Sequence, residues 1–131
     1  MRIRSLFLLP ALCLLLTAGD VPAPIAAKLV KIVSSGKVAC KDSEMAAALT
    51  AVGVSVEPGA KFAWAASEGE VKSLKAAGKC VLGNKLEWLV SGATLVIIEE
   101  GGKPQMIIHA GNLTASGATL PEVVLKVSKR Q

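Results

Sequence analysis

The sequence predicts an α/β domain built in three layers, with a mostly parallel sheet covered by helices on both faces. Short apolar runs alternate with amphipathic segments of about ten residues, which is the spacing of successive βαβ units. Two β-branched runs, residues 94–99 and 105–109, are apolar at consecutive positions, as expected of strands covered on both sides. Gly101 and Gly102 join these runs with the residues of a hairpin turn. The domain is therefore expected to end in an antiparallel hairpin followed by a helix.

Apolar spacing and turn residues place each element in order along the chain. Helices are expected over residues 24–34, 43–52, 68–77, 85–90 and a last segment that starts near residue 122. Strands are expected between them, over residues 37–40, 54–56, 61–66 and 79–82, before the two hairpin runs. The first helix is expected to turn its apolar positions toward the core, namely Ile25, Leu29, Ile32 and Val33.

Capping residues support the starts of two of these helices. Ser67 and Glu70 have the spacing of a capping box before the helix over residues 68–77. Thr119 and Glu122 repeat that spacing before the closing helix. The basic residues of the segment 126–130 are expected in the last turns of the closing helix, where they favour the negative end of its dipole.

The first 23 residues have the order of a secretory signal peptide. Arg2 and Arg4 precede an apolar run over residues 5–18, and small residues follow it. Cleavage is expected after one of three small residues, Gly19, Ala23 or Ala27. The apolar run is short for a hydrocarbon layer of roughly 30 Å, so an uncleaved anchor is the less favoured alternative. A single exported domain over residues 24–131 is therefore expected, with no stable membrane insertion after cleavage.

The composition argues against nucleic acid as a partner. Removal of the leader lowers the formal net charge from +5 to about +4, and the lysines that remain are scattered singly. Only Phe62, Trp64 and Trp88 remain as aromatic residues, too few for a surface on which bases stack. The lysines are therefore interpreted as solvated outer faces of the helices and strands.

Residues that could carry catalysis are few. His109 is the only histidine, and it is expected in the second hairpin strand with Glu99 opposite or diagonal to it. This pair is interpreted as a partly exposed histidine beside a carboxylate rather than as a catalytic base. Cysteines and carboxylates lack the spacing of zinc or EF-hand ligands, and no glycine-rich phosphate loop occurs. The chain is therefore expected to have no catalytic residue, no cofactor and no metal.

Three further residues each have two open interpretations. Cys40 and Cys80 form an even pair, which favours a disulfide in an oxidising compartment. The alternative interpretation is a pair of small buried thiols. Cys40 ends the first strand and Cys80 begins the fourth, so in a parallel sheet they lie at opposite ends of their strands, whereas a disulfide needs Cα atoms within about 7 Å. Trp88 is either a core residue or an exposed anchor in a protein interface.

The order of elements in the second half of the chain is similar to that of a known protein family. Residues 98–109 and 112–126 supply a hairpin, a small helical turn and a capped last helix in succession. Together with the strand and capped helix that start at Phe62 and the run over residues 78–82, this succession resembles the YfiR-like periplasmic regulators. The resemblance implies an α/β fold and a non-enzymatic protein exported to the periplasm of a Gram-negative bacterium. It also implies an inner-membrane signalling partner, since the family restrains a membrane-bound diguanylate cyclase from the periplasmic side.

Two functions follow as hypotheses. The first is a regulatory protein that works through a protein surface, with homodimer formation left open. The second is a small-molecule carrier or sensor that uses the crevice at the carboxyl ends of the parallel strands. Six residues are expected at that crevice: Lys41, Asp42, Ser67, Glu68, Gly83 and Asn84. A polar cluster lining a pocket would favour the second function, whereas a flat apolar patch around Trp88 or the hairpin would favour the first.

Overall fold

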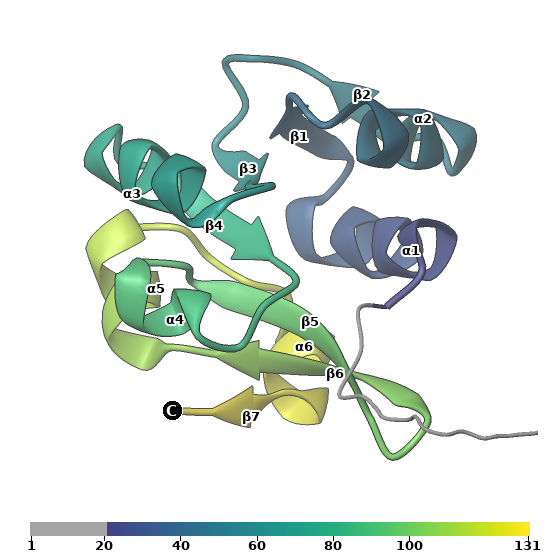
Figure 1. The fold of residues 1–131 in the computed structure, drawn as a ribbon. Coiled ribbons are helices and arrows are strands. Elements are labelled where there is room, and N and C mark those ends of the chain that lie inside the picture. Colours follow the sequence, from purple (N-terminus) through teal and green to yellow (C-terminus); the bar gives the residue numbers. More distant parts are fainter. Residues whose placement is uncertain (1–20) are drawn as a thin grey trace, which may run out of the picture.

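A seven-stranded sheet organises residues 21–131, the part of the chain that the computed structural model describes (Figure 1). The strand order is β2-β1-β3-β4-β5-β6-β7. The strands are β1 (Lys37–Cys40), β2 (Ser55–Val56), β3 (Phe62–Trp64), β4 (Cys80–Gly83), β5 (Leu95–Glu100), β6 (Lys103–Ile108) and β7 (Lys129–Arg130). Strands β1 to β5 run parallel, β6 is antiparallel to β5, and β7 is parallel to β6. The predicted α/β class, with a mostly parallel sheet and a C-terminal hairpin, is confirmed.

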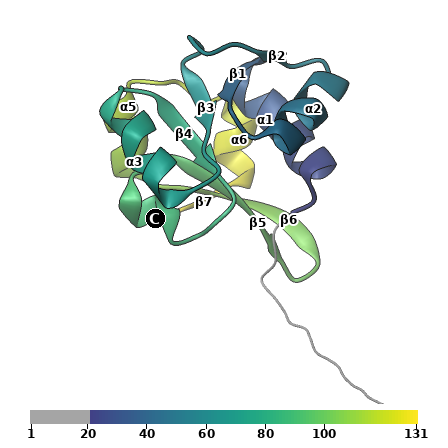
Figure 2. The ribbon, with the colours of Figure 1, turned by 45° about the horizontal axis from the view of Figure 1, so that its top comes forward.

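Helices cover both faces of this sheet. They are α1 (Ala23–Ser34), α2 (Ser43–Ala51), α3 (Glu68–Ala76), α4 (Trp88–Ser91), α5 (Ala110–Ser116) and α6 (Glu122–Val127). Helices α1, α2 and α6 contribute to one hydrophobic core, and α3 and α4 contribute to the core on the opposite face. Figure 2 shows α1 and α2 on one side of the sheet and α3 on the other. None of the helices between residues 21 and 131 combines the length and the apolar character that crossing a membrane requires.

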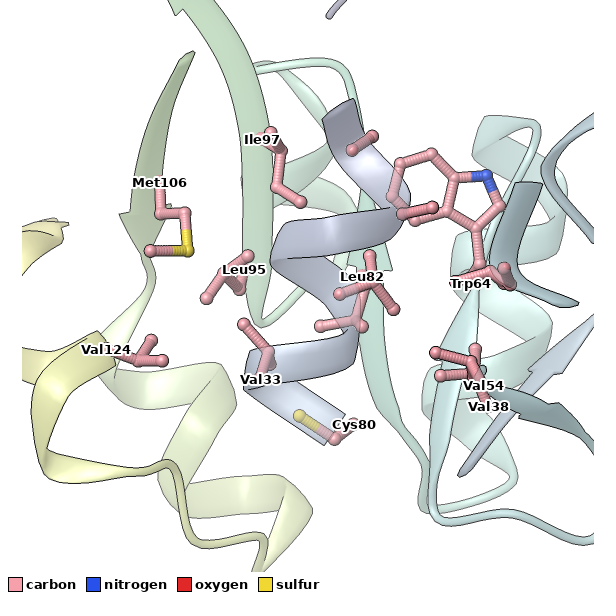
Figure 3. Packing of buried hydrophobic residues seen from close by; sticks show 14 of the residues in the cluster. Val33, Val38, Val54, Trp64, Cys80, Leu82, Leu95, Ile97, Met106 and Val124 are labelled. Atoms are coloured by element: carbon pink, nitrogen blue, oxygen red, sulfur yellow. The ribbon is translucent and has the colours of Figure 1, made fainter. Parts of the chain in front are cut away.

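The central strands divide their side chains between the two cores with a period of two. Leu95 and Ile97 of β5 lie in the core beneath α1, whereas Val96 and Ile98 lie in the core beneath α4. In Figure 3, Leu95 and Ile97 gather with Leu82 around Val33 of α1. Both faces of these strands are therefore apolar, which explains why they appear in the sequence as continuous apolar runs.

The second and third helices both start at a side-chain cap, and the capping box expected at Ser67 is confirmed. Asp42 caps α2, because its Oδ1 accepts a hydrogen bond of 3.1 Å from the Glu44 backbone N–H. Ser67 Oγ accepts from the Glu70 N–H at 3.2 Å, and Glu70 Oε1 accepts from the Ala66 N–H at 2.7 Å. These bonds satisfy backbone donors that a helix N-terminus leaves without partners.

The capping box expected at Thr119 is wrong. Helix α6 begins after Pro121, which makes no side-chain cap and whose carbonyl accepts from the Val124 and Leu125 N–H groups. The proline ring already holds φ near the helical value, at −58°, so the helix starts without a hydroxyl cap.

Helix α1 is rotated relative to the face that its sequence predicted. Ile25 and Ile32 are 40% and 50% exposed, and Val33 is buried together with Ala26, Ala27 and Val30. Ala26 and Ala27 belong to the same core cluster as Met45 and Leu49 of α2, so small side chains of α1 occupy the space beside that helix. The sequence prediction is therefore confirmed for Val33 and wrong for Ile25 and Ile32, which remain on the surface.

The end of the chain is also not helical as expected. Ser128 adopts extended backbone angles, and Lys129 and Arg130 then form β7 beside β6. The edge of β6 offers unpaired backbone groups, to which a short extended segment can bind. Lys129 Nζ also lies 2.6 Å from Glu100 Oε1, so its charge stabilises the hairpin rather than a helix terminus.

His109 does not lie beside Glu99, contrary to the sequence prediction. In the β5–β6 register Glu99 faces Pro104, whereas His109 follows the last strand residue and caps α5. Its Nδ1 accepts a hydrogen bond of 3.0 Å from the Asn112 backbone N–H. The only histidine therefore terminates one element and starts the next.

Trp88 lies in the core, with 8% of its surface exposed. A Cβ atom added at Gly83 would lie 2.7 Å from Trp88 Cε3, so the indole ring rests directly against the bare backbone of β4. Of the two interpretations of Trp88, the structure supports the core residue and not the exposed interface anchor. The strongly exposed apolar residue of this helix is its neighbour Val90.

We predict that Gly83→Ala lowers the free energy of unfolding by about 1–3 kcal/mol, because the new methyl group overlaps the Trp88 ring. Urea denaturation followed by Trp fluorescence measures the change. Gly69→Ala is the matched control, since a Cβ at Gly69 meets nothing within 4 Å and alanine favours the helix there. That control should leave stability equal or raise it by up to about 1 kcal/mol. Equal stabilities for Gly83→Ala and the native chain would contradict the close contact.

Candidate functional site

The order of strands reverses between β1 and β3. From β1 the chain passes through α2 to β2 on one side, whereas β3 leads through α3 to β4 on the other side. Helices α2 and α3 consequently cover opposite faces, and the loops that enter them diverge from the carboxyl ends of neighbouring strands. Ligands of open α/β sheets characteristically bind in the crevice at such a point.

The larger of two cavities at this crevice has a volume of about 370 Å³. It is lined by Ala39, Cys40, Lys41, Val56, Pro58, Trp64, Glu70 and Leu74. The space has a simple origin in the sequence. On this face the buried side chains of β1 and β3 are the small Ala39 and Ala63, and Leu74 of α3 packs against them. Small residues on the sheet thus leave room between β1, the end of β2 and α3.

The smaller cavity has a volume of about 250 Å³ and lies on the α1 side of the same strand ends. Its lining consists of Val21, Pro22, Ala23, Ala26, Asp42, Glu44, Met45, Trp64 and Asn84. Trp64 therefore lines both cavities, and Figure 3 shows its ring directed toward α1. The two spaces share this side chain at the end of β3.

The structure brings three of the six expected crevice residues to these cavities. Lys41 lines the larger cavity, and Asp42 and Asn84 line the smaller one. Ser67 and Glu68 line neither of them, because Ser67 caps α3 and Glu68 accepts a hydrogen bond from the Ser91 hydroxyl group.

Gly83, the sixth residue expected at the crevice, is buried against Trp88. Sequence reasoning missed Glu70, which it treated only as a capping residue, and it missed Trp64. The position of Trp64 as the last residue of a strand was the available signal.

Acidic and basic residues gather at opposite ends of the parallel strands. Five acidic residues follow the carboxyl ends of β1, β2 and β3: Asp42, Glu44, Glu57, Glu68 and Glu70. Lysines lie at the amino ends of β3 and β4. There Lys61 Nζ donates to the Gly78 carbonyl and Lys79 Nζ donates to the Ala60 carbonyl, both at 2.7 Å. The crevice is therefore an acidic region of a chain whose net charge is positive.

The disulfide predicted as one alternative for Cys40 and Cys80 is not formed, and both residues are free thiols. Strand β3 separates their strands, and Cys40 lies level with Trp64 whereas Cys80 lies level with Phe62. Two strand spacings and two residues along the strand correspond to on the order of 12 Å. A disulfide accepts at most about 7 Å between Cα atoms, so the pair cannot form without a change of the sheet.

Cys40 lines the larger cavity as a free thiol. Its Sγ donates to the Asp42 carbonyl at 3.5 Å. Burial, with smaller contributions from the negative charges of Asp42 and Glu70, raises the pKa of the Cys40 thiol to about 11. Burial likewise raises the pKa of the Cys80 thiol. Because the thiolate is the reactive form, Cys40 is a poor nucleophile at neutral pH.

Within residues 21–131, no group of three or more His, Cys, Asp or Glu side chains is arranged to hold a metal ion. The polar groups at the crevice are carboxylates, one ammonium group, one amide and one thiol. Such groups can bind and orient a small polar molecule by charge and hydrogen bonds.

Comparison with solved structures places this fold among known α/β domains. A conserved domain protein from Vibrio cholerae superposes with a TM-score of 0.64 at 12% sequence identity. The ABC domain from Streptococcus pneumoniae in complex with L-Trp superposes with a TM-score of 0.60 at 15% identity. Each match covers 83% of this chain and 60% of the other, so the chain spans about three fifths of these proteins. No protein-family model and no curated protein matches the sequence.

We predict that iodoacetamide labels Cys40 slowly at pH 8 in the folded Cys80→Ala variant made without the leader. A thiol whose pKa is about 11 has roughly 100-fold less thiolate at that pH than one with the usual value of 9.0. The labelling rate, followed by intact mass, should rise steadily toward pH 11. Glu70→Gln should raise the rate at pH 8, because it removes a nearby negative charge. Equal labelling rates in the folded chain and in urea would contradict this prediction.

Proposed function

We propose that the protein is an exported small-molecule-binding domain whose ligand occupies the larger cavity at the carboxyl ends of β1, β2 and β3. The observation that carries the proposal is a cavity of about 370 Å³ at the point where the strand order reverses. Its volume lies within the range of small-molecule sites, roughly 300–1,000 Å³, and its walls are mainly apolar with a few polar groups. Export is supported by the order of residues 1–23.

The charged groups of the cavity favour a zwitterionic ligand. Glu70 uses Oε1 to accept from the Ala66 N–H, which leaves its other oxygen for an ammonium group of a ligand. Lys41 has no hydrogen-bond or ion-pair partner among the residues described, and its ammonium group can bind a carboxylate. In the same cavity, Val56, Pro58 and Leu74 offer apolar contact. An apolar amino acid or a related zwitterion combines these three features.

The streptococcal domain that shares the fold was solved in complex with L-Trp. That complex supports an amino-acid-like ligand as the first class to test, with the site defined here by the residues of this chain. The cavity is smaller than many ligand sites, which favours a molecule of single amino-acid size.

Isothermal titration of residues 20–131 with L-Trp and L-Leu, and with the single-charge analogues tryptamine and indole-3-propionate, tests this function. The zwitterions should bind saturably, and removal of either charge should weaken binding by about tenfold. Glu70→Gln should weaken amine-containing ligands while its amide oxygen still accepts from the Ala66 N–H, and Lys41→Gln should weaken carboxylate-containing ligands.

Matched controls come from an ion pair far from the cavity. Glu122→Gln and Lys126→Gln make the same charge changes on the exposed face of α6 and should not alter binding. The proposed ligand class would be refuted if none of these compounds bound saturably. It would also be refuted if the control variants weakened binding as much as Glu70→Gln and Lys41→Gln do.

A second candidate function is regulation of a membrane-bound signalling enzyme through a protein surface. The exposed Ile25 and Ile32 of α1 favour it, since they leave an apolar stripe on the outer face of that helix. Exposed Val123 and Val127 of α6 lie on the same side of the sheet. The resemblance of the second half of the sequence to the YfiR-like regulators supports a periplasmic location and an inner-membrane partner.

Photocrosslinking from position 32 tests this second function in the native cells. A benzoylphenylalanine at Ile32 should capture one inner-membrane protein that carries a cytoplasmic signalling domain, and Ile25→Ser should weaken that capture. The control is the same probe at Val90, which is 91% exposed on the opposite helical layer. Equal capture from both positions, or capture of no membrane protein, would count against regulation through α1.

A further inference from the structure

The beginning of the folded domain bears on how the chain is processed. Val21 precedes α1, yet only 6% of its surface is exposed, and it belongs to the hydrophobic core beneath that helix. Pro22 is the N-cap residue of α1, and its carbonyl accepts from the Ile25 and Ala26 N–H groups, both at 3.0 Å. The folded unit thus includes residues that the sequence assigned to the leader.

The three cleavage positions expected from the sequence have different consequences for these contacts. Cleavage after Ala23 removes Val21 from the core and removes the Pro22 carbonyl from the start of α1. Cleavage after Ala27 additionally removes Ala26 and Ala27, which belong to the buried face of α1. Cleavage after Gly19 leaves all of these contacts in place.

The same segment forms a wall of the smaller cavity. Val21, Pro22 and Ala23 line that space together with Asp42 and Glu44. A chain that starts at residue 24 would open the cavity to solvent on this side. The smaller cavity and the hydrophobic core therefore share these N-terminal residues.

We propose that the leader is removed by hydrolysis of the peptide bond between Gly19 and Asp20, so that the exported protein begins at Asp20. A signal peptidase supplies the catalysis, and one water molecule is consumed. The reaction leaves a carboxylate on Gly19 and an α-ammonium group on Asp20. Thr17 and Gly19 provide the small residues required at positions −3 and −1. This inference rests on the export that is part of the proposed function.

Intact-mass measurement of the exported protein tests the inference directly. The full chain, expressed with its own leader in a Gram-negative host, should appear in the osmotic-shock fraction with a mass that begins at Asp20. A chain that begins at Pro24 or Lys28 would overturn the assignment while leaving export intact. Full-length protein retained in the membrane fraction would overturn export itself, so the two failures are distinguishable.

Two sets of variants separate the processing signal from the stability of the product. Gly19→Leu should block cleavage, because a bulky residue then occupies position −1, whereas Ala23→Leu should leave the position of cleavage unchanged. Among chains made without a leader, one that starts at Pro24 should melt at least about 4 °C below one that starts at Asp20. Val21→Ala in the chain that starts at Asp20 should reproduce part of this decrease in melting temperature. Equal melting temperatures for the two chains would overturn the argument from burial.

Discussion

The structure depends on one constraint, the burial of the central strands on both faces. Leu95 and Ile97 of β5 require one apolar layer, and Val96 and Ile98 require another on the opposite side. A chain with parallel strands meets this requirement only if its crossover helices are divided between the two faces. The division occurs where the strand order reverses, between β1 and β3. The crevice is thus a geometric result of covering the sheet, and the residues at the strand ends determine what it can bind.

A single polar side chain joins the elements on the second face. The Asn112 amide nitrogen donates to the Leu89 and Ala93 carbonyls at 2.9 and 2.8 Å, where the short helix α4 ends. The Asn112 amide oxygen accepts from Lys75 Nζ at 3.3 Å. One buried residue of α5 therefore satisfies carbonyls of α4 and holds a lysine of α3. Buried carbonyls at the end of a helix destabilise the folded state when they lack hydrogen-bond donors. The Asn112 side chain therefore contributes more to the stability of the fold than its size suggests.

Local patterns predicted the elements well, because period-two burial and caps are encoded in neighbouring residues. The strand positions and the cap at Ser67 are examples. Features that depend on distant contacts were not predictable. The face that α1 buries depends on its packing against α2 and the sheet, and the position of Trp88 depends on the absence of a side chain at Gly83. The larger cavity arises from small residues on two different strands that α3 only partly covers. No segment of the sequence contains that information alone.

The two outer strands of the sheet affect how the protein behaves at high concentration. Strands β2 and β7 are each only two residues long, and β7 consists of Lys129 and Arg130. Pro58, close after β2, provides no backbone donor for a further strand. Short edges with positive charge or a nearby proline disfavour the addition of strands from another molecule. A chain with 52% hydrophobic residues would otherwise be prone to form extended intermolecular sheets. The fold thus limits amyloid-type aggregation at both ends of the sheet by leaving little backbone available for pairing.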